Sequence, residues 1–131
     1  MIGHLKGTII SKNPPEVILE VGGIGYEVLC PMSTFYQLDN LSEDVLLFTH
    51  LSIKEDGHTL FGFVTKDEKN IFRELIRVNG VGPKVALAIL SHLTVKSLIE
   101  CISTEDADLL AKTPGIGKKT ALKLIVELQD R

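Results

Sequence analysis

Two similar nine-residue stretches occur in the second half of the chain, and the second begins 35 positions after the first. Residues 79–87 read NGVGPKVAL and residues 114–122 read PGIGKKTAL. Both copies have glycine, an aliphatic residue and a second glycine, followed by a matching lysine and a matching Ala-Leu pair. Two copies are too few for a stable helical solenoid. Since an ordinary connection between helices needs only one glycine, two glycines flanking an aliphatic residue require a more specific explanation.

A Gly-aliphatic-Gly turn in front of a helix has the properties of a phosphate-binding loop. The glycines permit positive φ angles and remove side chains that would block a close approach. The aliphatic residue, Val81 or Ile116, can pack beneath the loop. The free N–H groups at the start of the following helix then point outward, together with the positive end of the helix dipole. This arrangement binds phosphate through the backbone, so that recognition should be largely independent of base sequence.

Lysines in the first turn of these helices support that interpretation. Lys84, Lys118 and Lys119 lie where a cation opposes the helix dipole, a placement that becomes favourable when an anion occupies the site. The segment 117–120 also resembles the end of an ATP-binding P-loop, but Lys112 stands where that motif requires glycine. We therefore expect no ATP site. The simpler alternative is that each turn is only a tight connection between helices.

The first half of the chain has the pattern of short strands. Segments rich in Val, Ile, Leu and Phe (4–12, 16–21, 25–30, 45–53 and 59–64) are separated by turn signals such as 13–15, 22–23 and 55–57. Five strands at this spacing, with a short helical stretch near 33–38, indicate a small closed barrel. An OB-type barrel is favoured, although the pattern is also compatible with an SH3-like one. The glycine-rich segment 22–25 lacks the spacing of a dinucleotide-binding loop and predicts a hairpin turn.

Beyond residue 64 the apolar residues fall at helical spacings, beginning with Ile71, Phe72, Leu75 and Ile76. Residues 103–106 are typical of a helix start, with a hydroxyl N-cap and acids in the first turn. We therefore predict an α+β chain. Residues 1–64 would form an OB-type β-barrel domain, and residues 65–131 an all-α domain with two helix-hairpin-helix motifs.

The charge of the chain is unevenly distributed. Its formal net charge is −3, which at first argues against a nucleic-acid partner. However, residues 1–77 hold seven basic and eleven acidic side chains, whereas residues 78–131 hold seven basic and six acidic ones. Lys112, Lys118, Lys119 and Lys123 lie within a segment that contains no acid. Because the Debye length is about 8 Å at physiological salt, such a local basic patch can hold DNA on an otherwise acidic chain.

The composition argues against several other classes of protein. Cys30 and Cys101 are far apart and belong to no CxxC pair, which predicts two reduced, buried thiols in a cytoplasmic protein. The N-terminus lacks the apolar region of a signal peptide, and the apolar runs are too short to span a bilayer. No residues stand at catalytic or metal-ligand spacing. We therefore expect a non-catalytic protein with no metal and no other cofactor.

The paired glycine motifs resemble those of the RuvA family, the Holliday-junction-binding subunits of the bacterial RuvAB complex. Residues 1–3, 6–7, 22–28 and 60–63 are similar to the first domain of that family. The resemblance implies a four-fold homotetramer, or a face-to-face octamer, that holds a four-way DNA junction open and planar during recombination and repair. It also implies two partners, the RuvB ATPase and the RuvC resolvase.

The resemblance assigns roles to particular residues. An acidic pin would consist of Glu55 and Asp56. The DNA-binding residues would lie in the two loops and one turn beyond the second: Asn79, Gly80, Val81, Gly82, Pro83, Lys84, Pro114, Gly115, Ile116, Gly117, Lys118, Lys119 and Lys123. The family also has a third helical domain that docks on RuvB, whereas this sequence stops at Arg131. We therefore expect the chain to bind junctions without supporting ATP-driven branch migration.

Two other functions are compatible with the same pattern. The chain could be the DNA-binding part of a nuclease or glycosylase, for which Glu55 and Asp56 would be the paired carboxylates. It could also be a general single-strand binder built on the OB barrel. That function requires aromatic stacking residues on the barrel face, yet the chain has no Trp and only two Tyr residues, Tyr26 and Tyr36.

Overall fold

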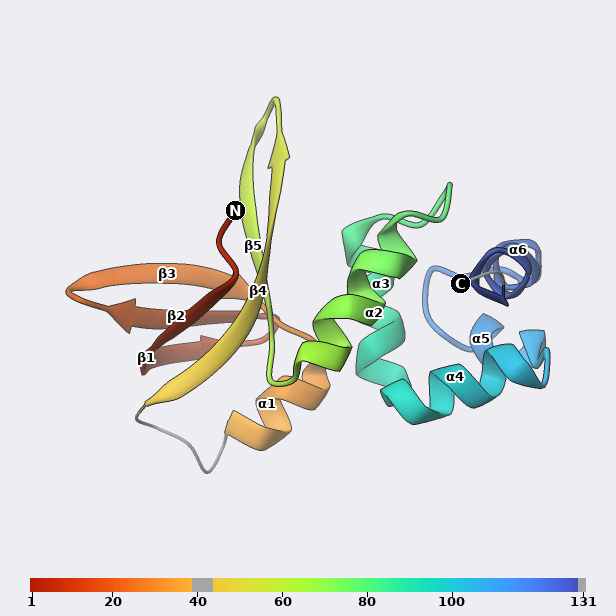
Figure 1. Ribbon diagram of the computed structural model, residues 1–131, viewed down its shortest axis with the longest axis horizontal. Helices are drawn as coiled ribbons and strands as arrows, with labels where there is room; N and C mark the ends of the chain where they lie inside the picture. The colour runs from red at the N-terminus through yellow and green to blue at the C-terminus, as the bar shows by residue number, and fades with distance from the viewer. Residues whose placement is uncertain (39–43, 130–131) are drawn as a thin grey trace. The chain divides into compact units, whose positions relative to one another are not determined.

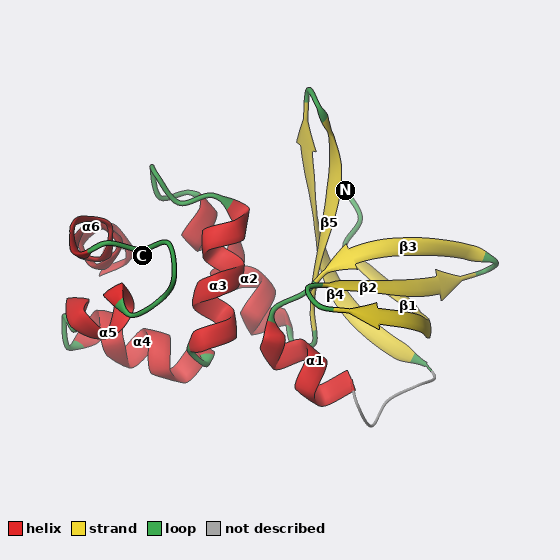
Figure 2. Cartoon of the chain, turned by 180° about the vertical axis from the view of Figure 1, so that it is seen from behind, coloured by secondary structure: helices red, strands yellow, loops and turns green. Residues whose placement is uncertain are grey.

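The computed structural model describes residues 1–38 and 44–129, and the chain packs as two units that divide between Lys69 and Asn70 (Figure 2). The predicted division lay at the end of the last strand, after residue 64. The packing divides later because the first turn of the following helix is bonded to the barrel. There Ser33 Oγ donates to Glu68 Oε2 at 3.0 Å, and Lys69 Nζ donates to the Gly3 carbonyl at 3.2 Å.

The first unit is a closed five-stranded barrel with the strand order β1-β2-β3-β5-β4. All neighbouring strands are antiparallel except β3 and β5, which are parallel. Helix α1 lies between β3 and β4 along the chain, and this topology is the OB type that the sequence favoured (Figure 1). The elements are β1 (His4–Asn13), β2 (Glu16–Val21), β3 (Ile24–Leu29), α1 (Met32–Leu38), β4 (Val45–Lys54) and β5 (Gly57–Phe63).

The barrel interior is filled by alternate residues of the strands and by one end of α1. Val17 and Leu19 of β2 are fully buried, and Phe35 and Leu38 of α1 belong to the same core. Cys30 lies in this core, and its burial raises the pKa of the thiol to about 12. Cys101 is likewise buried in the second unit, so that both cysteines are buried, unpaired thiols as predicted.

Two hairpin turns of the barrel match the predicted turns. The chain reverses between β2 and β3 at Gly22 and Gly23, both of which have positive φ. Between β4 and β5 the last paired residues are Lys54 and Gly57, which leaves Glu55 and Asp56 as the two residues of the turn. The β4–β5 hairpin extends beyond the other strands of the barrel, so that its tip projects into solvent (Figure 1).

The second unit consists of helices joined by short turns. Helix α2 (Lys66–Ile76) begins beside the barrel and is followed by α3 (Pro83–His92), α4 (Val95–Ser103), α5 (Ala107–Ala111) and α6 (Lys118–Gln129). Buried apolar side chains from each of these helices form the core of the unit, among them Phe72, Leu90, Leu98, Leu110 and Leu124. Within the described residues no single helix is long and apolar enough to cross a membrane, although α3 and α4, bent by 98° at their junction, pass that test as a pair.

The prediction of a hydroxyl N-cap within 103–106 is wrong. Ser103 is the last residue of α4, and Thr104 Oγ1 donates back to the Glu100 carbonyl at 2.9 Å, so that this hydroxyl closes the preceding helix. The chain then turns at Glu105, whose φ is 56°. Asp106 caps α5 instead, because its Oδ1 accepts from the Leu109 N–H at 3.1 Å.

Candidate nucleic-acid interface

The two glycine loops have the same backbone conformation. The first joins α2 to α3 and the second joins α5 to α6, so that each stands between two helices as a helix-hairpin-helix motif. Three backbone hydrogen bonds of the first loop recur in the second loop, 35 residues later and at nearly equal lengths. In donor-to-acceptor order they are Val78 to Leu75 (3.1 Å) and Thr113 to Leu110 (3.0 Å), Val81 to Val78 (3.0 Å) and Ile116 to Thr113 (3.1 Å), and Ala86 to Gly82 (3.0 Å) and Ala121 to Gly117 (3.0 Å).

The two glycines of each loop differ in what they do. Gly80 and Gly115, the first of each pair, have φ angles of 92° and 89°, a region that side chains rarely adopt. Gly82 has an ordinary φ of −90°, and the φ of Gly117 is not positive either. A Cβ added to Gly82 or Gly117 would meet nothing within 4 Å. The fold of the chain therefore does not require the second glycines, and their effect is to leave open space beside the loop.

The aliphatic residue between the glycines packs inward, as the sequence predicted. Val81 and Ile116 are 4% and 5% exposed, whereas the flanking glycines are all exposed to solvent. Each aliphatic side chain therefore anchors its loop to the core of the unit and holds the exposed backbone in place.

Helix α3, which follows the first loop, begins without a side-chain cap. Gly82 is the N-cap of α3, it has extended backbone angles, and no side chain bonds to the first turn. Pro83 occupies the first helical position, where its missing N–H costs nothing. The N–H groups of Lys84 and Val85 then have no acceptor within the helix. Two donors and the positive end of the helix dipole are thus available to an anion.

The predicted lysines lie at and after these helix starts. Lys84, Lys118, Lys119 and Lys123 are all exposed to solvent. Lys118 Nζ lies 3.9 Å from Asp108 Oδ1, and both side chains are more than two-thirds exposed. Such an exposed ion pair contributes little, so that Lys118 can exchange this partner for a phosphate at small cost.

The two loops lie side by side within the second unit. A Cβ placed on Gly115 would be 3.8 Å from Val85 Cγ2, so that the tip of the second loop contacts the first turn of α3. The sequence indicated two similar loops but not their proximity. Because of this contact the tip of the second loop lies beside the start of the helix that follows the first loop.

The structural repeat extends further than the repeat in the sequence. Val78 and Thr113, which precede the two motifs, are each 1% exposed, and their carbonyls accept the bonds that close the loops. Sequence analysis missed both residues. The available signal was a β-branched residue at the same position before each motif.

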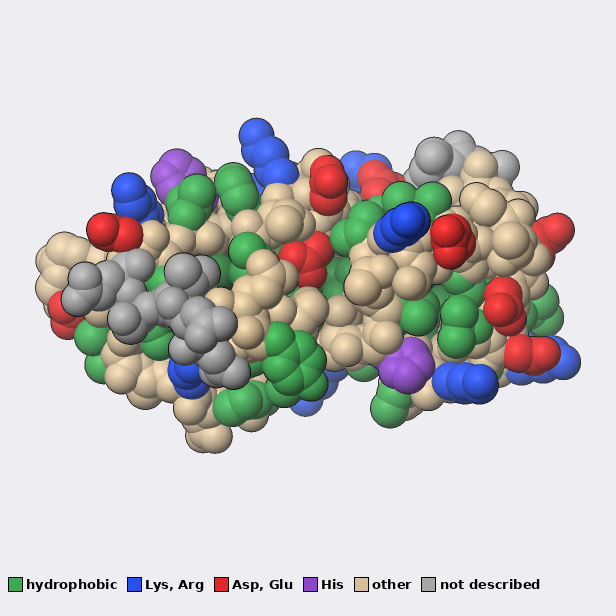
Figure 3. Space-filling view, turned by 90° about the horizontal axis from the view of Figure 1, so that it is seen from below, with side chains coloured by type: hydrophobic (Ala, Val, Ile, Leu, Met, Phe, Trp, Pro, Cys, Tyr) green, Lys and Arg blue, Asp and Glu red, His purple; other side chains and the backbone are tan. Residues whose placement is uncertain are grey.

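The predicted acidic pin residues are exposed at the tip of the β4–β5 hairpin. Glu55 and Asp56 are the two turn residues, and both neighbours, Lys54 and Gly57, are exposed as well. On the face seen in Figure 3, acidic and basic side chains are interspersed and no large area carries a single charge. Within the described ranges, no three His, Cys, Asp or Glu residues lie close enough together to hold a metal ion.

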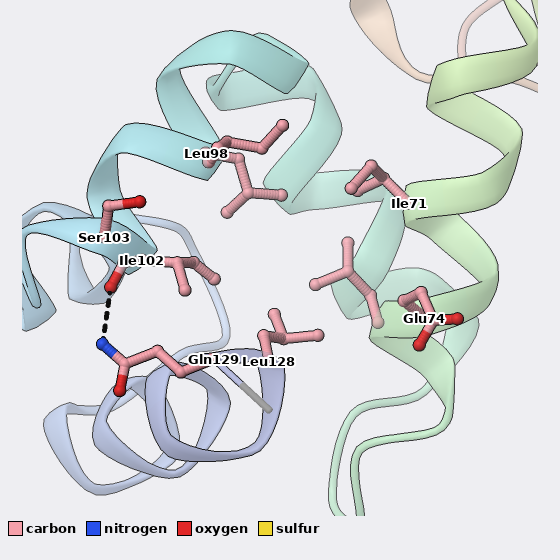
Figure 4. Close-up of a pocket in the computed structure, with 9 residues that line it drawn as sticks. Ile71, Glu74, Leu98, Ile102, Ser103, Leu128 and Gln129 are labelled. Atoms are coloured by element: carbon pink, nitrogen blue, oxygen red, sulfur yellow. Dashed lines mark hydrogen bonds between the residues drawn. The ribbon is translucent and has the colours of Figure 1, made fainter. Parts of the chain in front are cut away.

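A cavity of about 400 Å³ lies elsewhere in the second unit, between α2, α4 and the end of α6. Its wall is mainly apolar, with side chains of Ile71, Leu98 and Leu128 facing it (Figure 4). Gln129 Nε2 donates to the Ile102 carbonyl at 3.0 Å at its edge. Neither glycine loop contributes to this cavity.

Known proteins similar to this chain match both units. Residues 1–62 match the family described as "RuvA N terminal domain", and residues 72–130 match the family described as "SAM-like Helix-hairpin-helix tandem". A Pseudomonas aeruginosa protein named "Holliday junction branch migration complex subunit RuvA" is 55% identical over all 131 residues, which span 65% of its length. Proteins of the same name from Pseudomonas entomophila and Vibrio cholerae are 53% and 52% identical, with 64% of their length spanned.

The matches agree with the structure in both units. The first unit, the barrel, matches the amino-terminal RuvA domain, the second unit, with its tandem loops, matches the helix-hairpin-helix family, and the chain spans slightly less than two thirds of the RuvA proteins that it resembles.

Proposed function

We propose that this chain binds four-way DNA junctions by their structure and independently of base sequence. It would hold them open and planar as the non-catalytic subunit of a branch-migration complex in recombination and repair. The observation that carries the proposal is the pair of equivalent, adjacent loops, each with an exposed helix start and an unoccupied space beside its second glycine. The name of the relatives, which describes a Holliday junction branch migration complex subunit, supports the choice of substrate.

The proposed contacts are to DNA phosphates. In each loop the exposed backbone around Gly80–Gly82 or Gly115–Gly117 would approach the phosphate closely. The N–H groups at the helix start would donate to its oxygens, and Lys84, or Lys118 and Lys119, would contribute charge. Such contacts fix the position of the duplex but read no bases. The remaining predicted residues, Asn79, Pro83, Pro114 and Lys123, would border this surface in the proposed complex.

Selection of a junction requires more than one copy of the chain. A single pair of loops holds one duplex weakly, whereas a four-fold homotetramer would hold four arms at once and gain affinity through multivalency. We therefore propose that the tetramer is the binding species, and that its planar complex presents the arms to the RuvB ATPase. Glu55 and Asp56 of each copy would lie near the crossover and repel any continuous duplex placed there.

The test is a comparison of dissociation constants for a synthetic four-way junction, its component duplex and junctions of scrambled sequence, at fixed salt. We expect the junction to bind at least a hundredfold more tightly than the duplex, and scrambled junctions to bind alike. A preference of more than about tenfold for one arm sequence, equivalent to ~1.4 kcal/mol, would contradict backbone recognition. Light scattering with and without the junction would show whether a tetramer or an octamer is formed.

A further inference from the structure

Arg77 and Lys112 occupy equivalent positions in the two hairpins. Each lies three residues before the positive-φ glycine of its loop and 35 residues from its counterpart. The backbone N–H of Arg77 donates to the Glu74 carbonyl at 3.3 Å, and that of Lys112 donates to the Leu109 carbonyl at 3.2 Å. The structural repeat therefore includes these cations, although they precede the repeated sequence.

The fold keeps both side chains at the surface. Each cation is followed by a residue that is 1% exposed, Val78 or Thr113, which directs the chain into the core at the next position. The Arg77 side chain is 69% exposed, and Lys112 is exposed as well. Since neither is used to fill the core, both remain available to a ligand that covers the loops.

The local charge around the loops favours an anionic ligand. No acidic residue occurs between positions 75 and 99, or between positions 109 and 126, and these two segments contain both loops. Arg77 forms an ion pair with Glu74, at 3.5 Å between side chains that are 69% and 36% exposed. An ion pair of this exposure is weak and can exchange for a phosphate.

We propose that Arg77 and Lys112 are further phosphate-binding residues, so that each loop is bracketed by two cations: Arg77 and Lys84 in the first, Lys112 and Lys119 in the second. The ligand is the phosphodiester backbone of the DNA arm that the loops hold, and the inference rests on the proposed function. Each loop's amides hold one phosphate, and the cation before the loop contacts the backbone on the side away from the following helix.

The test uses R77Q and K112Q, with K96Q as the matched control. Lys96 is an exposed lysine of α4 that lies outside both hairpins. Junction affinity is measured over a range of salt concentrations. The slope of log K against log salt is negative, and each lost phosphate contact reduces its magnitude by about 0.9. We expect R77Q and K112Q each to weaken binding about threefold, as for one screened charge, and to flatten the slope, while K96Q changes neither.

A purely structural role for these cations has a different signature. Each lies at the C-terminal end of a helix, where a cation also stabilises the helix dipole. If that were its only role, R77Q and K112Q would lower the melting temperature and leave the salt slope of binding unchanged, which would overturn the inference. An equal loss of slope in K96Q would overturn it too. The charge-preserving variants R77K and K112R should keep the wild-type slope. Failure of the wild-type chain to prefer junctions would instead contradict the proposed function.

Discussion

The chain presents two kinds of exposed turn that differ in charge and in what holds them. The glycine loops of the helical unit expose backbone N–H groups and lysines, and a buried aliphatic side chain anchors each loop. The tip of the β4–β5 hairpin exposes two carboxylates, Glu55 and Asp56, and is held by the pairing of its strands up to Lys54 and Gly57. If the loops attract phosphate and the tip repels it, as proposed above, attraction would depend on a fixed backbone shape, whereas repulsion would require only that charge project into solvent.

The two glycine loops also differ from each other. Their backbones are equivalent, yet the first has Pro83 where the second has Lys118, and the second is followed by an additional exposed lysine, Lys123. In the proposed complex the first loop would therefore depend more on its amide groups, whereas the second loop would add more charge. Since a fixed donor geometry is not screened as an exposed lysine is, changes in shape should harm both loops, but changes in charge should harm the second loop more.

The largest expected effect comes from filling the open space beside a loop. Gly82→Ala and Gly117→Ala should weaken junction binding by at least about thirtyfold, or ~2 kcal/mol, because a Cβ would stand where the phosphate approaches. Stability should fall by less than about 1 kcal/mol, the scale of an N-cap change, because the added atom meets nothing in the chain. Gel shift and thermal melting measure the two quantities. Normal binding by both variants would exclude backbone contact at these sites.

The positive-φ glycines provide the control for that result. Gly80→Val and Gly115→Val should lower both stability and binding, because a β-branched residue at a φ near 90° is strained by roughly 1–3 kcal/mol. The sequence favoured positive φ at both glycines of each loop, and for Gly117 this is wrong, so that the strain argument does not apply there. If the valine variants keep wild-type stability, the loop geometry described above is incorrect.

The charge difference between the two loops predicts a smaller, graded effect. The double variant Lys118→Gln/Lys119→Gln should weaken junction binding about tenfold or more, whereas Lys84→Ala should weaken it only about threefold, since each exposed lysine contributes one screened charge. The double variant should also flatten the salt dependence about twice as much. A titration of binding against salt measures both. Equal losses from the two loops would contradict the proposed division between shape and charge.

The acidic tip should affect selectivity more than affinity. Neutralising it with Glu55→Gln/Asp56→Asn should strengthen binding to continuous duplex about threefold, because a duplex lying across the centre no longer meets the repelling carboxylates. Binding to the junction, whose strands separate there, should change less. The measured quantity is the ratio of the duplex and junction dissociation constants at fixed salt. If this ratio is unchanged, the tip is only a turn and the pin assignment fails.

The smallest effect is expected at the acid nearest the second loop. Asp108→Asn removes the 3.9 Å partner of Lys118 and should strengthen junction binding by no more than about twofold, because the pair is exposed and weak. The gain should disappear in a Lys118→Gln background, which a double-mutant cycle would show. An equal gain in both backgrounds would mean that Asp108 acts through general charge rather than through this lysine.

Much of the fold could be predicted because its signals are local. Strand periodicity and the turn residues Gly22 and Gly23 indicated a small barrel, and the resulting segments agree with the observed strands to within about two residues at either end. The exceptions are sites where a residue's role depends on its partner. Thr104 is a residue type that often caps the start of a helix, but its hydroxyl donates to the Glu100 carbonyl in the preceding helix. Residue type alone does not show whether such a hydroxyl bonds to the helix before it or to the helix after it.

The sequence by itself determined the existence of the two loops. Their defining residues, two glycines that flank an aliphatic residue and a lysine that follows, lie close together along the chain, so that local spacing is enough to predict the turn. The tertiary structure decided three further properties. It closed the barrel by pairing the distant strands β3 and β5 in parallel. It placed Gly115 against Val85, so that the tip of the second loop lies beside the start of helix α3. It also extended the repeat back to Arg77 and Lys112. The first two properties arise from contacts between segments far apart in the sequence, which local residue patterns cannot predict. The third is a matter of local backbone bonds, three residues apart, that differing side chains at the two positions conceal in the sequence.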